Sequence, residues 1–408
     1  MKLDLNFVRS QFPAFTEDTH EGWAFFENAG GSYPCRQVVD RLHDFYLRLK
    51  VQPYYPNPIS QAGGAAMDES YRKLAGYLNV SADEVHLGPS TTQNTYVLAR
   101  AMRPFWRKDG EIIVTNQDHE ANSGAWRKLG DTGMVIREWQ VDPATGLLDP
   151  ADLDALLNER TCLLAFPHCS NIVGHMNPVS TIAGKAREVG ALTVCDGVAA
   201  APHGLPDVGA LGVDIYLFSL YKTWGPHLGC MTVRRDLLDR MENQGHFFNA
   251  HHPHKKLVPA GPDHAQIASA AGVIDYLDAL CVHHHIEGNA AERGHRLHEL
   301  FIPQERQLLD TLLHWIRGRD DLRLIGPETT RDRAPTVAVV PLRKPMSDLL
   351  PVLSRRRIMA GSGHFYAARL LEALGIPLDS GVLRFSFLHY TSPAEMDQLL
   401  SALGEALD

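Results

Sequence analysis

Polar residues that could take part in catalysis follow several short apolar runs of this sequence. Asp196 comes directly after ALTVC, Lys222 lies just beyond VDIYLF, Asn171 lies just beyond TCLLAF, and His119 follows EIIVT after a short loop. A lysine amine can form a bond with a carbonyl compound, a carboxylate can hold a cationic ring nitrogen, and a histidine can stack on a planar ring. Taken singly, each of these residues is more often a turn residue or a solvated charge.

A second feature suggests a site for an anion. The segment HLGPSTTQNTYVLARAM places Gly88, Ser90, Thr91 and Thr92 directly before a predicted helix. Free N–H groups at the start of a helix bind phosphate well, although the same residue types also cap ordinary helices. The sequence contains neither a G-x-G-x-x-G motif nor a Walker loop, which disfavours a dinucleotide or nucleotide ligand.

The combination of these residues is more informative than any one of them. Pyridoxal phosphate needs a lysine for covalent attachment, a carboxylate beside its pyridine nitrogen and a site for its phosphate. Lys222 comes one predicted strand after Asp196, and both lie where strands of one sheet would end. Ligands of open α/β sheets bind at the carboxyl ends of the strands, so the arrangement predicts a pyridoxal-phosphate site.

The elements that would position these residues alternate along the middle of the chain. Three of the predicted strands are nearly apolar on both faces, as in sheets that helices cover on both sides. The alternation of strand and helix predicts an α/β fold with a mainly parallel, doubly wound sheet. The strands are predicted at 111–115, 133–139, 161–166, 191–195, 213–218 and 228–233, and the helices at 119–129, 149–159 and 178–190.

The pattern changes after residue 262. Long helices are predicted over 264–317, and strands at 335–340, 356–359 and 382–387 then alternate with further helices. This order predicts a smaller C-terminal α+β domain. We therefore expect three parts: an N-terminal segment that packs on the small domain (1–20), a large cofactor-binding domain (21–262), and linking helices with the small domain (263–408).

Length and composition narrow the class of protein further. The 408 residues carry a net charge of −9, with 44% apolar and 21% charged residues, which is typical of a globular chain and not of a nucleic-acid-binding one. Neither a signal peptide nor an apolar run long enough to cross a membrane is apparent. The six cysteines form no C-x-x-C pair and indicate reduced thiols. We expect a cytoplasmic enzyme that binds neither nucleic acid nor membrane.

The 21 histidines form two clusters, at 246–254 and 283–285, that could suggest a metal site. Consecutive histidines on a helix point in different directions, whereas ligands on one face are spaced four residues apart. No cysteine or acidic ligand is interleaved at a suitable interval, so we expect no metal site.

Several motifs, in order along the chain, resemble those of class V aminotransferases and cysteine desulfurases, which are fold-type-I pyridoxal-phosphate enzymes. The longest is CDGVAAAPHGLPDVGALGVDIYLFSLYKTWGPHLG, which carries Asp196 and Lys222. The others are FFENAGGSYPC, STTQNT, DHEANSGAW, HCSNIVGHMNPV and GVLRFSFLHYTSPAEMDQLL. The resemblance covers most of the chain and implies pyridoxal 5′-phosphate as the cofactor. It also implies a homodimer, because such enzymes generally build each site from two chains.

The resemblance implies a role for individual residues. Lys222 would carry the cofactor as an internal aldimine and move protons, Asp196 would hold the pyridine nitrogen, and His119 would stack on the ring. The other residues expected at the cofactor are Thr91, Thr92, Asn171, Ser219 and Tyr221. The residues expected at the substrate are Asn28, Ala29, Tyr366 and Arg384, of which Arg384 would bind the α-carboxylate.

Two departures from the desulfurase pattern limit what the resemblance implies. Ala199 stands where desulfurases carry a glutamine near the cofactor's phenolic oxygen, and Tyr366 stands where they carry the catalytic cysteine. Without a thiolate at that position, a persulfide cannot form by the usual route. The chain therefore resembles the branch of the family that lacks this cysteine.

These observations favour an aminotransferase that acts on an amino acid. A C–S lyase, or a β-eliminating enzyme without a persulfide cysteine, is the alternative, because the two reactions differ only after the substrate's Cα has become a carbanion. A non-catalytic binding protein that has kept the fold is a third possibility. The joint presence of Lys222, Asp196, His119 and Arg384 disfavours it.

Overall fold

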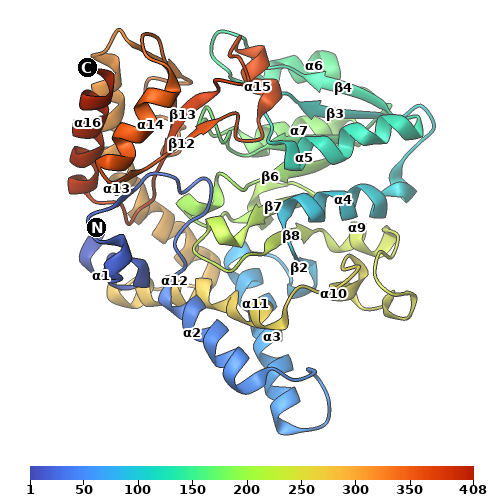
Figure 1. The fold of residues 1–408 in the computed structure, drawn as a ribbon. Helices are drawn as coiled ribbons and strands as arrows, with labels where there is room; N and C mark the ends of the chain where they lie inside the picture. The colour runs from blue at the N-terminus through green and yellow to red at the C-terminus, as the bar shows by residue number, and fades with distance from the viewer.

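A seven-stranded sheet lies at the centre of the computed structural model, which describes residues 1–408 (Figure 1). Neighbouring strands from β7 to β4 are parallel, whereas β8 is antiparallel to both β7 and β2. The predicted, mainly parallel sheet is confirmed. In the order of pairing, its strands are β2 (Val85–Gly88), β8 (Gly229–Val233), β7 (Ile215–Ser219), β6 (Leu192–Asp196), β5 (Thr161–Pro167), β3 (Glu111–Thr115) and β4 (Val135–Trp139).

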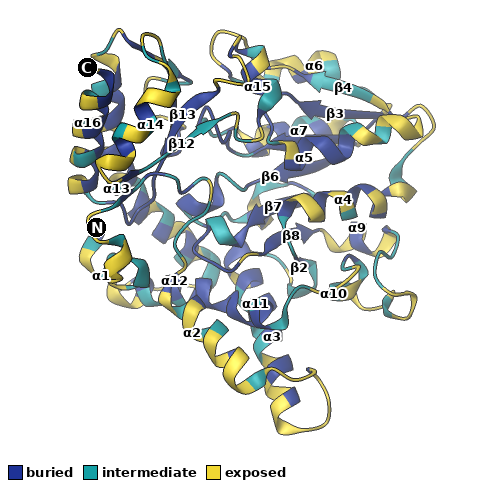
Figure 2. Cartoon of the chain, viewed as in Figure 1, coloured by how far each residue is buried: buried dark blue, intermediate teal, exposed yellow.

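The central strands are buried on both faces, as their nearly apolar sequences predict. Ile113 and Leu164 belong to one hydrophobic core, and their chain neighbours Ile112 and Leu163 belong to another. Because successive side chains of a strand point to opposite faces, the two cores lie on opposite sides of the sheet. Figure 2 shows these strands as buried beneath their covering helices. The helices around the sheet include α4 (Thr91–Ala101), α5 (Glu120–Arg127), α7 (Val179–Glu188), α8 (Val208–Leu211), α9 (Arg235–Arg240) and α10 (Pro253–Lys256).

The helix predicted at 149–159 is mostly absent. A 3-10 turn leads into α6 (Leu153–Leu156), which is a single turn of α-helix, and Leu157 is extended. The carbonyl group of Leu156 accepts a hydrogen bond from Arg137 of β4. The Arg137 side chain thus satisfies a carbonyl group at the end of this helix, which stops short of the predicted residue 159.

A second, four-stranded antiparallel sheet forms the C-terminal unit, with its own hydrophobic core. The strands of this sheet, in pairing order, are β12 (Gly361–Gly363), β13 (Val382–Ser386), β10 (Thr336–Pro341) and β9 (Leu322–Ile325). The helices of this part are α13 (Ala290–Arg317), α14 (Met346–Arg355), α15 (Ala368–Ala373) and α16 (Pro393–Leu407).

The run at 356–359 does not join that sheet. β11 (Ile358–Met359) pairs with β1 (Ala24–Phe25) in a separate parallel pair. Residues 24–25 therefore lie against the C-terminal unit, although the expected boundaries assign them to the large domain. The division into 1–20, 21–262 and 263–408 stays a prediction.

The N-terminal helix α1 (Leu5–Ser10) contacts both the C-terminal unit and the helices that lead to it. Arg9 donates to the carbonyl group of Tyr390 at 2.9 Å and pairs with Glu395. Phe12 packs edge-on against Tyr276 and Tyr390. This segment thus fastens the C-terminal unit to the linking helices.

One stretch corrects the expectation that no run could cross a membrane. His264–His283 has a mean hydropathy of 1.3 over its most apolar window, and 72% of that window is buried inside the protein. It forms α11 (His264–Ser269) and α12 (Ala271–His283), which pack against α2 (Arg36–Asp44) and α3 (Pro58–Leu78). We interpret the stretch as part of the protein core.

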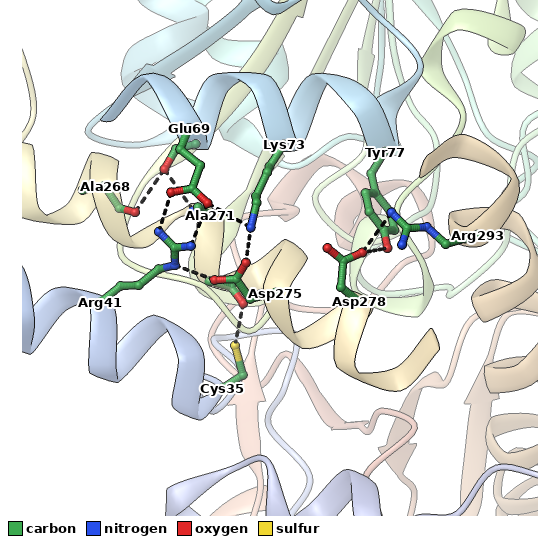
Figure 3. Close-up of polar contacts among 12 residues, drawn as sticks. Cys35, Arg41, Glu69, Lys73, Tyr77, Ala268, Ala271, Asp275, Asp278 and Arg293 are labelled. Carbon is green, nitrogen blue, oxygen red and sulfur yellow. Dashed lines mark hydrogen bonds and ion pairs between the residues drawn. The ribbon is translucent and has the colours of Figure 1, made fainter. Parts of the chain in front are cut away.

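Ion pairs join three of these helices, α2, α3 and α12 (Figure 3). Arg41 of α2 makes a bidentate contact with Glu69 of α3, at 2.9 and 3.1 Å, and also pairs with Asp275 of α12. Lys73 of α3 bonds to the same two carboxylates. These side chains are partly exposed, so each pair contributes only about 0–1 kcal/mol. Their shared partners fix the relative positions of the helices.

Candidate active site

Residues from four strand ends and from the C-terminal unit line one cleft. His119 follows β3, Asn171 follows β5, Asp196 ends β6, and Lys222 follows β7 in a short 3-10 turn. The predicted strand ends are therefore brought together at one edge of the sheet, as the topology requires. The other predicted residues in the lining are Asn28, Ala29, Thr91, Thr92, Ser219 and Tyr221.

Lys222 presents a free amine to the cleft and is the only lysine in its lining. Burial lowers the pKa of Lys222 to about 8, with a further decrease from the positive charge of Arg384. An amine with a lowered pKa is more often neutral and therefore more nucleophilic near neutral pH. Two residues further on, the buried Trp224 has φ of 59° in the left-handed region, which is strained for a bulky residue and typical of functional sites.

Asp196 offers one carboxylate oxygen to the cleft. Its Oδ1 accepts a hydrogen bond from the backbone N–H of Val198 at 2.8 Å, and the chain supplies no partner for the other oxygen. Burial raises the pKa of Asp196 to about 6. A cation placed at the free oxygen would stabilise the charged form of this carboxylate.

Asp118 is a second buried carboxylate that the sequence analysis missed. Its Oδ2 accepts from Asn122 at 3.0 Å and from Thr115 at 3.4 Å, while Oδ1 is buried without a partner. Burial, followed by the charge of Asp196, raises the pKa of Asp118 well above its usual value. Its position directly before His119 was the available signal.

His119 is held as a neutral ring. It caps the start of α5, where its Nδ1 accepts a hydrogen bond from the backbone N–H of Ala121 at 3.0 Å. Burial, together with the nearby Lys222 and Arg384, lowers the pKa of His119 to about 3. A neutral imidazole with Nδ1 engaged is suited to stacking on a planar ring and not to holding a charge.

The start of α4 forms the anion-binding part of the cleft. Ser90 caps this helix, and the hydroxyl groups of Thr91 and Ser219 are hydrogen-bonded at 2.8 Å. A Cβ atom on Gly229 would lie 2.4 Å from the backbone of Ser90 and Thr91, so only glycine lets β8 approach this turn. The close packing fixes the free N–H groups at the helix start in one place.

The side chains of Asn171 and Arg384 both donate hydrogen bonds to backbone carbonyl groups. Asn171 donates from Nδ2 to the carbonyl group of Phe365 at 3.0 Å, and its Oδ1 is buried without a partner. Arg384 is 3% exposed, donates from Nη1 to the carbonyl group of Asn171 at 3.1 Å, and stacks 3.7 Å from the ring centre of Phe365. Arg384 therefore lies beneath the loop that contains Phe365 and is not part of the open lining.

Three other predicted substrate-side residues differ in their surroundings. Asn28 lines the cleft, but its amide is bonded to the carbonyl group of Ser386 at 3.0 Å and to Tyr390. The backbone N–H of Ala29 donates to the hydroxyl group of Ser386 at 2.8 Å. Tyr366 is 68% exposed and lies outside the lining, with its ring centre 5.2 Å from that of His119.

The family model for aminotransferase class-V matches residues 24–399. The chain belongs to the class V aminotransferase family. Aminotransferase-like protein FGM3 from Gibberella zeae is 31% identical over 97% of this chain and 96% of its own length. A probable cysteine desulfurase from Streptomyces coelicolor is 29% identical over 98% of this chain and 96% of its own length.

Solved structures agree on the fold. The cysteine desulfurase from Thermococcus onnurineus superposes with a TM-score of 0.86 at 21% identity, covering 100% of this chain and 98% of its own. The cysteine desulfurase CsdA from Escherichia coli gives a TM-score of 0.83 at 22% identity, covering 100% of this chain and 99% of its own. The predicted fold-type-I architecture is confirmed.

Members of the class V family use pyridoxal phosphate, and the residues of this cleft fit that cofactor. The free amine of Lys222, the free oxygen of Asp196 and the helix start at Ser90 match its aldehyde, ring nitrogen and phosphate in chemical type. The neutral ring of His119 adds a stacking surface.

The cleft lacks two features of the desulfurase pattern, the glutamine near the cofactor and the catalytic cysteine. The methyl group of Ala199 lies in a small apolar cluster with Cys169, where it offers no hydrogen bond. All six cysteines are buried, and burial raises the pKa of Cys169 to about 12. Across the whole chain, no group of three or more His, Cys, Asp or Glu side chains is arranged to hold a metal ion.

Proposed function

We propose that this protein is a pyridoxal-phosphate-dependent aminotransferase that acts on an α-amino acid. The observation that carries the proposal is the free amine of Lys222 in a cleft that Asp196 also lines. Arg384 lies next to this cleft, beneath the loop that contains Phe365. When bound, the cofactor supplies an electron sink for the negative charge that develops at the substrate's Cα.

Each side chain of the site has a separate role in this proposed reaction. Lys222 attaches the cofactor and then moves a proton at Cα as general acid and base. Asp196 keeps a positive charge at the ring nitrogen, and Arg384 orients the substrate through its carboxylate. Thr91, Thr92 and Ser219 hold the phosphate, and Tyr221, whose ring stacks on His227 at 4.5 Å, borders them.

A C–S lyase or β-eliminating enzyme is the second candidate, because several relatives are named cysteine desulfurase. Incubation with single amino acids, with and without a 2-ketoacid, separates the two. An aminotransferase makes a new amino acid only when the ketoacid is present. Ketoacid-independent release of pyruvate and ammonia would instead identify a lyase, and no change in the cofactor's visible band with any amino acid would favour a non-catalytic protein.

Replacing Arg384 with lysine should raise KM for amino acids by about tenfold or more. Lysine keeps the charge but loses the planar fork that holds a carboxylate with two parallel hydrogen bonds. The measurement is kcat/KM for an amino acid and for the amine that lacks its carboxylate. Arg369→Lys, at a partly exposed arginine paired with Glu120, is the matched control. Unchanged kinetics for Arg384→Lys would exclude this role.

Incubation with cysteine should leave no persulfide on the protein. In the resemblance to desulfurases, Tyr366 stands where the nucleophilic thiol would be, and all six cysteines are buried, which disfavours a reactive thiolate. Alkylation followed by mass analysis of the peptides provides the test. Stoichiometric persulfide on any cysteine, including Cys169 in the cleft lining, would instead identify a sulfur-transferring enzyme.

We further propose a cytoplasmic homodimer whose contact includes the projecting α2–α3 hairpin (Figures 1 and 2). This hairpin gathers exposed apolar side chains, and exposed apolar patches of this kind mark interaction surfaces. The residues are Val39, Tyr46, Leu47, Val51, Tyr54, Tyr55 and Ile59.

Leu47→Asp should therefore convert the dimer into a monomer of reduced activity. Light scattering alongside the activity assay measures both properties. Leu342→Asp, at an exposed leucine in the C-terminal unit, should change neither. A wild-type protein that is monomeric and fully active at working concentration would reject the proposal.

A further inference from the structure

A carboxylate of the chain itself already contacts Arg384. Oε1 of Glu27 lies 3.4 Å from Nη2 of Arg384, and the two side chains are 34% and 3% exposed. Backbone pairing holds them together, because Glu27 forms a bridge with Ser386, two residues along β13 from Arg384. No role was assigned to Glu27 from the sequence.

Two glycines leave room for this carboxylate. A Cβ atom on Gly361, which pairs directly with Arg384 in the sheet, would lie 2.5 Å from Oε2 of Glu27. A Cβ atom on Gly30 would lie 3.2 Å from Cγ of Glu27. Neither glycine has a positive φ, so the backbone does not require glycine at either position. The space that they leave is filled by the Glu27 side chain.

The contact between Glu27 and Arg384 is incomplete. Nη1 is taken by Asn171, and one face of the guanidinium is covered by Phe365. Glu27 reaches only Nη2, at a long distance, and Nε of Arg384 is buried without a partner. A buried charged donor without a partner is costly, and a carboxylate that bonded to Nε and Nη2 together would be held more strongly.

We propose that Glu27 is a placeholder carboxylate, which occupies the Arg384 site in the substrate-free enzyme and is displaced by the carboxylate of the substrate. This rests on the proposed role of Arg384. The partial exposure of Glu27 lets its side chain turn into solvent, whereas the buried Arg384 stays in place. Glu27 thus keeps Arg384 paired between turnovers and sets the affinity for carboxylate ligands.

The test measures binding of propionate, a carboxylate without an amino group, to the cofactor-loaded enzyme by calorimetry. Glu27→Gln removes the competing charge and should tighten propionate binding by about fivefold to tenfold. Gly361→Ala keeps the charge but pushes the Glu27 carboxylate away from Arg384, and should also tighten binding. Glu21→Gln, which removes an exposed charge from the same N-terminal segment, should leave the affinity unchanged.

The outcomes separate this inference from the proposed function. If Arg384→Lys binds propionate as well as the wild type, or if no variant binds it, the role of Arg384 is wrong and the placeholder is wrong with it. If binding depends on Arg384 but Glu27→Gln and Gly361→Ala both leave it unchanged or weaken it, only the placeholder is wrong. Tighter binding in Glu27→Gln with unchanged binding in Gly361→Ala would show an effect of charge alone and would also overturn the displacement.

Discussion

Replacing Lys222 with alanine should lower kcat by at least about 1,000-fold, the range expected when a group that is both nucleophile and general base is lost. No other lysine lines the cleft, so no neighbouring amine can replace it. The variant should also lose the visible absorbance band of the covalently attached cofactor. Steady-state kinetics and absorbance of the same preparation test both effects.

Two further variants show whether the loss of activity is specific to the Lys222 amine. Lys222→Arg keeps a positive charge but has no amine that is neutral near pH 7, so it should be as inactive as the alanine variant. Lys108→Ala, at an exposed lysine outside the cleft lining, should retain wild-type kinetics. Substantial turnover in Lys222→Ala would mean that another group carries the chemistry.

Asp196→Asn should slow removal of the Cα proton by about 100-fold to 10,000-fold while the cofactor stays bound. Asparagine has the same size as aspartate but cannot supply the negative charge that stabilises a protonated ring nitrogen. Exchange of the Cα hydrogen of an amino acid with deuterated solvent measures this step without a known product. Cofactor content is measured in parallel.

The neighbouring carboxylate provides a sharp comparison. Because burial raises the pKa of Asp118 well above its usual value, its neutral form is favoured, and Asp118→Asn should cost far less than Asp196→Asn. Equal losses of exchange rate in the two variants would mean that both carboxylates together stabilise the protonated ring nitrogen. A near-normal exchange rate in Asp196→Asn would remove Asp196 from the mechanism.

The sequence was most informative where local patterns decide the structure. Strands such as Glu111–Thr115 and Thr161–Pro167 are short apolar runs bounded by polar residues, and each begins where predicted. Asp196 and Lys222 could be placed in one site because parallel strands end at the same edge of a sheet. Those inferences required only chain order and strand polarity.

The parts that the sequence did not reveal depend on contacts between distant segments. Glu27 faces Arg384 only because the bridge at Ser386 brings the start of the chain onto β13. The loop containing Phe365 covers Arg384 through stacking that no periodicity encodes. Asp118 was readable as an acid beside His119, but only the fold shows that it is buried near Asp196.

The measurement that tests the central claim most directly is borohydride reduction of the cofactor-loaded protein, followed by digestion and peptide mapping. Reduction fixes the cofactor permanently to the lysine that carries it. The account predicts one modified site, Lys222, in the peptide that contains SLYKTWGPH. A label on any other lysine, or a protein that takes up pyridoxal phosphate without reducible attachment, would contradict it.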